Sequence, residues 1–148
     1  MVNRTPCTFI RLVLGLAVCA VAVGAAQSTQ AKSVWAGVYT EAQARRGAEL
    51  YTNTCASCHG DDLAGIEQAP ALTGDGFGDK WNAKTLNRML AKLQEMPPSK
   101  PKSLTPEQYT DILAYMFYVN ELPTGDAALS SDPVALAEIT YSNVKPAK

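Results

Sequence analysis

Residues 55–59 bring two thiols and an imidazole together within five consecutive positions, in the order Cys55-Ala56-Ser57-Cys58-His59. His59 is the single histidine of the 148-residue chain, so its place directly after the second cysteine calls for a chemical reason. Two thiols three positions apart can project from the same side of one helical turn. Such a set could hold a metal ion, cycle between thiols and a disulfide, or bond covalently to a prosthetic group.

The pattern Cys-x-x-Cys-His predicts covalent attachment of a c-type haem. Thiols with this spacing match the two vinyl groups on one edge of a haem, and the adjacent His59 can turn its imidazole toward the iron. Three other interpretations stay open. A thioredoxin-like redox pair expects a preceding strand that we do not find, a structural zinc site needs four ligands, and a plain disulfide leaves His59 unexplained.

Met96 is the candidate for the second axial ligand of the iron. A Met thioether opposite a His raises the reduction potential of an electron-transfer haem. Of the four methionines, Met1 lies in the leader, whereas Met89 and Met116 lie on apolar helical stripes, where Met usually fills the core. Met96 instead precedes two prolines that must end a helix. The alternative is that Met96 merely packs. Two filled axial positions would leave no open site for oxygen or peroxide, which argues against an enzyme.

A first helix is predicted from Thr40 to about Thr54. Thr40 can cap its first turn, with Gln43 reaching back in a capping box. Gly47 and Tyr51 share one side of this helix, and Gly47 would let another backbone approach closely. We therefore expect another helix to cross the first one here.

Two more main helices follow a long irregular stretch. Residues 58–82 are rich in Gly, Asp and Pro, which favours loops, and a loop of this length is expected to wrap a ligand. Asn82 can cap a helix over residues 83–95 that two prolines end. A third helix over residues 105–120 begins with a cap, a proline and a capping-box partner. Beyond it we expect one short helix at Asp132-Pro133 and no strand.

The distribution of charged and apolar residues, together with the predicted helices, divides the chain into three segments. Residues 1–31 have the features of a signal peptide, because two arginines precede an uncharged apolar run and a small-x-small cleavage site. The alternative is a retained anchor helix. Residues 32–125 are the predicted monohaem domain, and residues 126–148 are a C-terminal tail. Cleavage would remove Cys7 and Cys19 and leave a mature protein without membrane insertion, in the periplasm if the source is bacterial.

Three segments resemble class I c-type cytochromes: Cys55 to Gly60, Pro70 to Gly74, and Met96-Pro97-Pro98. The resemblance covers roughly Val38 to Pro123. It implies an all-α class I cytochrome c fold, with three main helices and long loops that wrap one covalently bound haem c.

The resemblance also gives four residues a place around the haem. It implies that Gly47 and Tyr51 meet residues 113–118 where two helices cross. It puts Pro70 where a proline carbonyl accepts the ring proton of the ligating histidine, although from the residues alone Pro70 could equally stiffen a turn. It puts Trp81 where some members have a Trp hydrogen-bonded to a haem propionate, and ordinary core packing explains Trp81 equally well.

A narrower resemblance links Gly37 to Thr40, the Met-Pro-Pro segment and Leu104 to Tyr115 to cytochrome domains that accompany pyrroloquinoline quinone (PQQ)-dependent alcohol and sugar dehydrogenases. It implies single-electron transfer rather than catalysis. Electrons would come from a separate quinoprotein dehydrogenase and pass to a terminal oxidase or another cytochrome of the respiratory chain. The alternatives are a general periplasmic respiratory shuttle and a haem peroxidase or oxidase with an open axial position.

Charge narrows the class of partner. The formal net charge of -1 offers no basic footprint for nucleic acid. Between Lys80 and Lys102, however, six basic residues face only Glu95. Such a basic rim beside Met96 would steer an acidic redox partner toward the haem edge, and the alternative is an ordinary solvated helix face.

Overall fold

The computed structural model describes residues 32–67 and 69–147, and the predicted signal peptide, residues 1–31, lies outside them. Among the described residues six α-helices dominate, which confirms the all-α class. None of the described helices is both long and apolar enough to span a membrane. In chain order the elements are β1 Lys32–Ser33, the 3-10 helix Val34–Ala36, α1 Glu41–Thr54, α2 Ala56–His59, α3 Gly74–Trp81, α4 Leu86–Gln94, α5 Pro106–Val119, α6 Pro133–Ala137 and β2 Ile139–Thr140.

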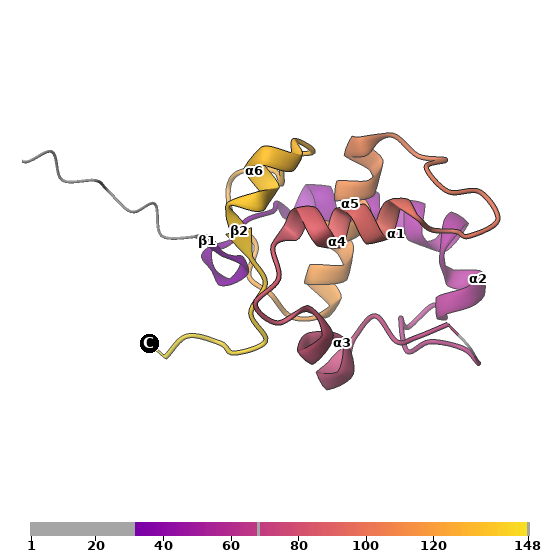
Figure 1. The fold of residues 1–148 in the computed structure, drawn as a ribbon, viewed down its shortest axis with the longest axis horizontal. Helices are drawn as coiled ribbons and strands as arrows, with labels where there is room; N and C mark the ends of the chain where they lie inside the picture. The colour runs from indigo at the N-terminus through magenta and orange to yellow at the C-terminus, as the bar shows by residue number, and fades with distance from the viewer. Residues whose placement is uncertain (1–31, 68, 148) are drawn as a thin grey trace, which may run out of the picture.

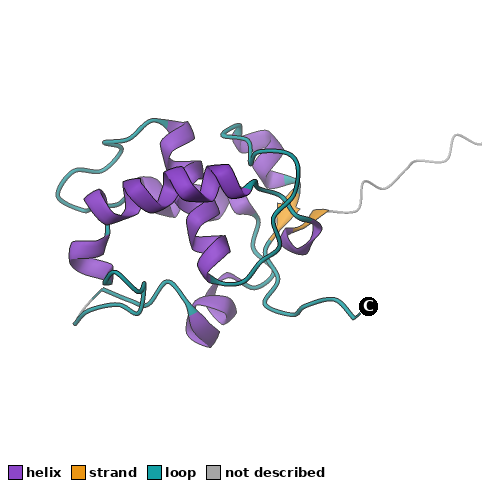
Figure 2. Ribbon diagram, turned by 180° about the vertical axis from the view of Figure 1, so that it is seen from behind, coloured by secondary structure: helices purple, strands orange, loops and turns teal. Residues whose placement is uncertain are grey.

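The helices separate the molecule into two ends. Figure 1 shows α1 and α5 crossing steeply at the centre, with α2 at one end and α6 and the two strands at the other. The long loops 60–73 and 95–105 lie at the same end as α2 (Figure 2). The five residues of the Cys-x-x-Cys-His motif therefore lie at the end where the chain is mostly loop.

Gly47 sets the closeness of the central crossing. A Cβ atom at this position would lie 1.9 Å from the carbonyl oxygen of Asp111 and 2.9 Å from the Cβ of Tyr115. Beside it, the guanidinium of Arg46 donates to both carboxylate oxygens of Asp111 at 2.8 Å. The rings of Tyr51 and Tyr115 meet one turn further on, with centroids 5.4 Å apart. The crossing predicted at Gly47 and Tyr51 is confirmed.

Only one of the two hydrogen bonds of the predicted capping box forms at the start of α1. Thr40 does cap the helix, since its hydroxyl accepts the amide of Gln43 at 3.2 Å. The side chain of Gln43, however, is only 2% exposed. It donates to the carbonyl of Leu129 at 3.0 Å and accepts the amide of Leu129 at 2.7 Å. A buried amide side chain must find partners, and the C-terminal segment supplies both.

The segment from α3 to α4 departs most from expectation. Helix α3 occupies part of the stretch that was predicted to be irregular, and burial of Phe77 against the core outweighs the poor helix propensity of its glycines. Helix α4 begins at Leu86 after the N-cap residue Thr85, not at Ala83 after Asn82. Ala83 cannot start a helix because its φ is +59° and its amide donates to the carbonyl of Tyr141 at 3.0 Å.

Helices α5 and α6 begin as predicted. Thr105 and Gln108 form a complete capping box at the start of α5, and Asp132 caps α6 by accepting the amide of Val134. The expectation of no strand is wrong, because β1 and β2 pair in parallel, with Lys32 opposite Ile139. Strands of two residues are too short to leave an alternating pattern in a sequence.

Replacing Gly47 with Ala should lower the free energy of unfolding by about 3 kcal/mol, at the upper end of the cost of overpacking, because the added methyl group would overlap the α5 backbone. Unfolding in guanidinium chloride measures this. Gly76→Ala is the matched control. Gly76 also lies in a helix but has no atom within 4 Å of an added Cβ, so that change should be neutral or stabilising. Equal losses in the two variants would contradict the close crossing.

Candidate functional site

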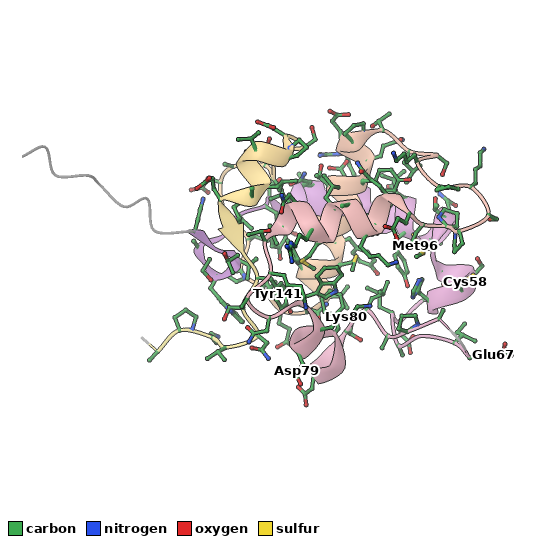
Figure 3. The ribbon with its side chains drawn as sticks, viewed as in Figure 1. Cys58, Glu67, Asp79, Lys80, Met96 and Tyr141 are labelled. Atoms are coloured by element: carbon green, nitrogen blue, oxygen red, sulfur yellow. The ribbon has the colours of Figure 1, made fainter. Side chains whose placement is uncertain are left out.

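A cavity of about 420 Å³ opens where α1, α2, α3, α4 and α5 face one another. This volume is typical of pockets that bind small molecules and cofactors, which span about 300–1,000 Å³. Figure 3 shows Cys58 on α2 and Met96 where α4 ends, so the side chains with metal-binding chemistry come from different elements. The lining is mostly apolar and includes Cys55, Cys58, His59, Pro70, Phe77, Trp81, Met89, Leu93, Met96, Ile112 and Met116.

The two cysteines reach the cavity from one helical turn. Cys55 is the C-cap of α1, and the amides of Cys58 and His59 donate to its carbonyl at 3.1 and 3.0 Å, which forms α2. This turn puts the two thiols on the same side, three positions apart. They are not joined in a disulfide. A group bonded to both sulfurs would lie directly against His59.

The chemistry of Cys55 differs from that of a redox-active thiol. Burial against the apolar lining, helped by the neighbouring Cys58, raises the pKa of the Cys55 thiol to about 11. Thioredoxin-like pairs depend on the opposite, a lowered pKa that yields a thiolate. The zinc interpretation fares no better, because no three His, Cys, Asp or Glu side chains gather as metal ligands within residues 32–67 and 69–147.

One ring nitrogen of His59, Nδ1, is hydrogen-bonded to the backbone, and the other, Nε2, can bind a metal. Its Nδ1 lies 2.8 Å from the carbonyl oxygen of Pro70. A carbonyl can only accept, so Nδ1 carries a proton in this contact, and in the neutral ring the lone pair is therefore on Nε2. This is the usual arrangement of a metal-ligating histidine, in which the acceptor fixes the ring and makes it a stronger ligand.

Sequence reasoning missed the residues that hold the Pro70 carbonyl in place. Gly65 has a φ of +81°, and a Cβ there would lie 2.6 Å from the Ala69 oxygen and 2.9 Å from the Pro70 carbonyl carbon. Its amide donates to the carbonyl of His59 at 2.8 Å. Gly65 thus bridges the two sides of the contact between His59 and Pro70. The only hint in the sequence is a glycine six residues after the histidine. Glycines are common in turns, so this one does not indicate a special role.

Tyr51 supports the same turn from α1. Its hydroxyl donates to the carbonyl of Gly60 at 2.7 Å, directly after His59, and burial raises the pKa of the Tyr51 phenol. The ring also lines the cavity. Tyr51 thus contacts both Tyr115 at the helix crossing and the turn that carries the motif.

Met96 lies just beyond α4, and its backbone is held from both sides. Its amide donates to the carbonyl of Leu93 at 3.0 Å, and the hydroxyl of Tyr109 donates to its carbonyl at 3.3 Å. Met89 and Met116 line the same cavity, but they are buried within helices, as expected. Three thioethers therefore border the site, and Met96 is the one on a non-helical segment.

Trp81 lines the cavity from the end of α3 and is half-buried. The Nζ atoms of Lys80 and Lys84 lie 5.8 and 5.9 Å from the centre of its ring. Lys80 and Lys92 also border the cavity. The positive charge beside Trp81 suits an anionic group on a bound cofactor, such as a carboxylate.

Comparison with known proteins identifies the family. A family model described as cytochrome c oxidase, cbb3-type, subunit III matches residues 42–116, just over half of the chain. No curated protein and no solved structure gives a significant match. The matched region contains the two cysteines, His59 and Met96, and the donor set around the cavity fits a covalently bound haem. The chain therefore belongs to this family and is a c-type cytochrome with a class I cytochrome c fold, a covalently bound haem c and a role in electron transfer.

Proposed function

We propose that this protein is an exported monohaem electron carrier in which Cys55 and Cys58 form the thioether bonds and His59 and Met96 are the axial ligands of the iron. The observation that carries the proposal is that one largely apolar cavity is lined by all four side chains. The protonated Nδ1 of His59 on the Pro70 carbonyl leaves Nε2 free to ligate.

The chain's own residues favour electron transfer over catalysis. When bound, the haem supplies an iron that changes oxidation state by one electron, and a Met opposite a His raises its potential. If Met96 fills the sixth position, no coordination site is left for oxygen or peroxide. The apolar lining from α4 and α5 would keep water away from a bound haem, which would further favour its reduced form. A site in which protein side chains fill both axial positions suits a carrier.

Two likenesses suggest electron-transfer partners: the resemblance to cytochrome domains of quinoprotein dehydrogenases and the match to the cbb3-type family. We propose that electrons come from a separate PQQ-dependent dehydrogenase and pass to the respiratory chain, outside the cytoplasm if residues 1–31 direct export. The description of the matched family favours a second candidate, a haem-bearing subunit of an oxidase complex of the cbb3 type. The two candidates differ in whether the protein is isolated alone or with other oxidase subunits.

The basic rim gives the proposed carrier a docking surface. Arg88 and Lys92 lie four positions apart on α4 and so share one side of it, whereas Lys84 precedes the helix and lies beside Trp81. Lys80 and Lys92 border the cavity itself. Lys92 also pairs with Glu95 at 2.7 Å, which tempers its charge. An acidic partner would be drawn to the rim where the cavity opens.

The protein, produced in a host able to mature c-type cytochromes, should carry one haem that resists acid-acetone extraction and should show a pyridine haemochrome spectrum. The reduced protein should not bind carbon monoxide at neutral pH, because both axial positions are filled. A colourless polypeptide would refute the covalent haem. Rapid carbon monoxide binding would instead favour the rival haem peroxidase or oxidase.

Replacing Met96 with Ala should lower the midpoint potential by more than roughly 0.1 V, because axial ligands set haem potentials over a range of about 0.8 V. The variant should also lose the weak near-infrared sulfur-to-iron band and bind carbon monoxide. Met89→Leu and Met116→Leu are matched controls, since these thioethers line the same cavity from within helices. Loss of the band in either control, with Met96→Ala unaffected, would assign the ligand to another methionine.

Reversing one rim charge should slow docking without altering the haem. Arg88→Glu should lower the rate of reduction by a purified PQQ-dependent dehydrogenase by roughly threefold at low ionic strength, since rim charges act on association rates. The difference should vanish at high salt. Stopped-flow absorbance measures both. Arg45→Glu is the matched control, because Arg45 is also an exposed arginine on a helix but lies on α1, outside the basic rim. Equal rates for the two variants at every ionic strength would contradict docking at the basic rim.

A further inference from the structure

A short C-terminal segment, residues 139–143, is hydrogen-bonded to the turn between α3 and α4. The amide of Ala83 donates to the carbonyl of Tyr141 at 3.0 Å, and the amide of Tyr141 donates to the carbonyl of Lys84 at 2.8 Å. Thr140 and Thr85 form an antiparallel bridge next to this pair. We call residues 139–143 the C-terminal clamp. It lies outside the region that the family model matches.

Two side chains of the clamp contact α3 directly. The ring of Tyr141, only 3% exposed, meets Phe77 edge-on with centroids 5.9 Å apart and lies 6.2 Å from Phe117 of α5. The side-chain amide of Asn143 donates to the carboxylate of Asp79 at 2.7 Å. A Cβ at Gly78 would lie 3.1 Å from the Cβ of Asn143, so the clamp packs against the helix backbone here. Figure 3 shows Asp79 on α3 and Tyr141 near this helix.

The other side of α3 faces the cavity. Phe77 and Trp81 both line it, with ring centroids 6.4 Å apart, and we call this pair the α3 wall. Helix α3 has eight residues, three of them glycine, so it has little stability of its own. Its position must come from packing. Tyr141 contacts the wall residue Phe77 from behind, and Asn143 holds the solvent side of the same helix.

The clamp is itself anchored to the start of the described chain. Its strand residues pair with β1, and the indole nitrogen of Trp35 donates to the carbonyl of Ser142 at 2.9 Å. The clamp is therefore fixed on one side to β1 and Trp35 and on the other to the turn before α4. A segment fixed in this way can transmit its position to α3.

We propose that Tyr141 and Asn143 are positioning residues that hold the α3 wall against the bound haem and so keep water out of that side of the cavity, an inference that rests on the proposed function of the cavity. Water entering there would stabilise the more highly charged oxidised iron and lower the potential. The residues act through Phe77 and Trp81 and do not touch the haem site themselves.

The test compares Tyr141→Ala with Tyr141→Phe, which keeps the ring and removes only the hydroxyl. Tyr141→Ala should retain covalent haem but show a lower midpoint potential, and its amides in residues 74–84 should exchange with deuterium roughly tenfold faster. Amides of α1 and of the part of α5 away from Phe117 should exchange as in the wild type. Tyr141→Phe should match the wild type in both measurements. An unchanged potential in Tyr141→Ala, or exchange accelerated equally throughout the chain, would overturn the proposal.

A second pair of variants tests the polar contact. Asn143→Asp places a carboxylate against Asp79 and should accelerate exchange in residues 74–84, whereas adding Asp79→Asn should restore the hydrogen bond with its partners exchanged. Absence of this rescue would remove Asn143 from the proposal. Hydrogen exchange does not require haem, so a wild-type protein lacking covalent haem would refute the proposed function while exchange still tested the clamp.

Discussion

The close crossing of α1 and α5 at Gly47 is the constraint on which the rest of the structure depends. At this point the α5 backbone occupies the space that a side chain would need. The fork between Arg46 and Asp111 fixes the direction of approach. Beyond the crossing, α1 ends at the first cysteine and α5 presents Ile112 and Met116 to the cavity. Because Gly47 has no Cβ, α5 can lie close to α1, and this sets the distance between residues 55–59 and the α5 side of the cavity.

A second layer of contacts converts this framework into a site for a metal ligand. The imidazole of His59 is oriented by a carbonyl from the following loop, and that loop folds back because Gly65 allows it to. Tyr51 ties the same turn to α1. These hydrogen bonds all involve backbone groups of residues 59–70. The orientation of the His59 ring therefore does not depend on solvent-exposed side chains. On the other side, Tyr109 anchors the backbone of Met96 from α5.

Features that depend only on neighbouring residues could be predicted from the sequence. The motif at residues 55–59 and the start of α5 are both visible in a few adjacent residues. The comparison between the starts of α1 and α5 shows where such reasoning ends. Each has Thr followed three positions later by Gln, yet Gln108 completes a capping box and Gln43 does not. Gln43 is buried against Leu129, 86 positions away, and that competition cannot be seen from the pattern. The same applies to α3, where Phe77 packs against Tyr141 of the distant C-terminal segment. The role of Met96 is also beyond sequence reasoning alone, since three thioethers border one cavity.

The pairing of Gln43 with Leu129 has a consequence for where this domain ends. A chain stopped at residue 125 would keep every residue of the haem motif but would strand a buried carboxamide, at a cost of about 1–3 kcal/mol for each unsatisfied polar group. It would also uncover the apolar surface beneath Leu136 and Tyr141. The packed core therefore extends beyond the region that carries the chemistry, and the pairing of β1 with β2 brings the two ends of the described chain together.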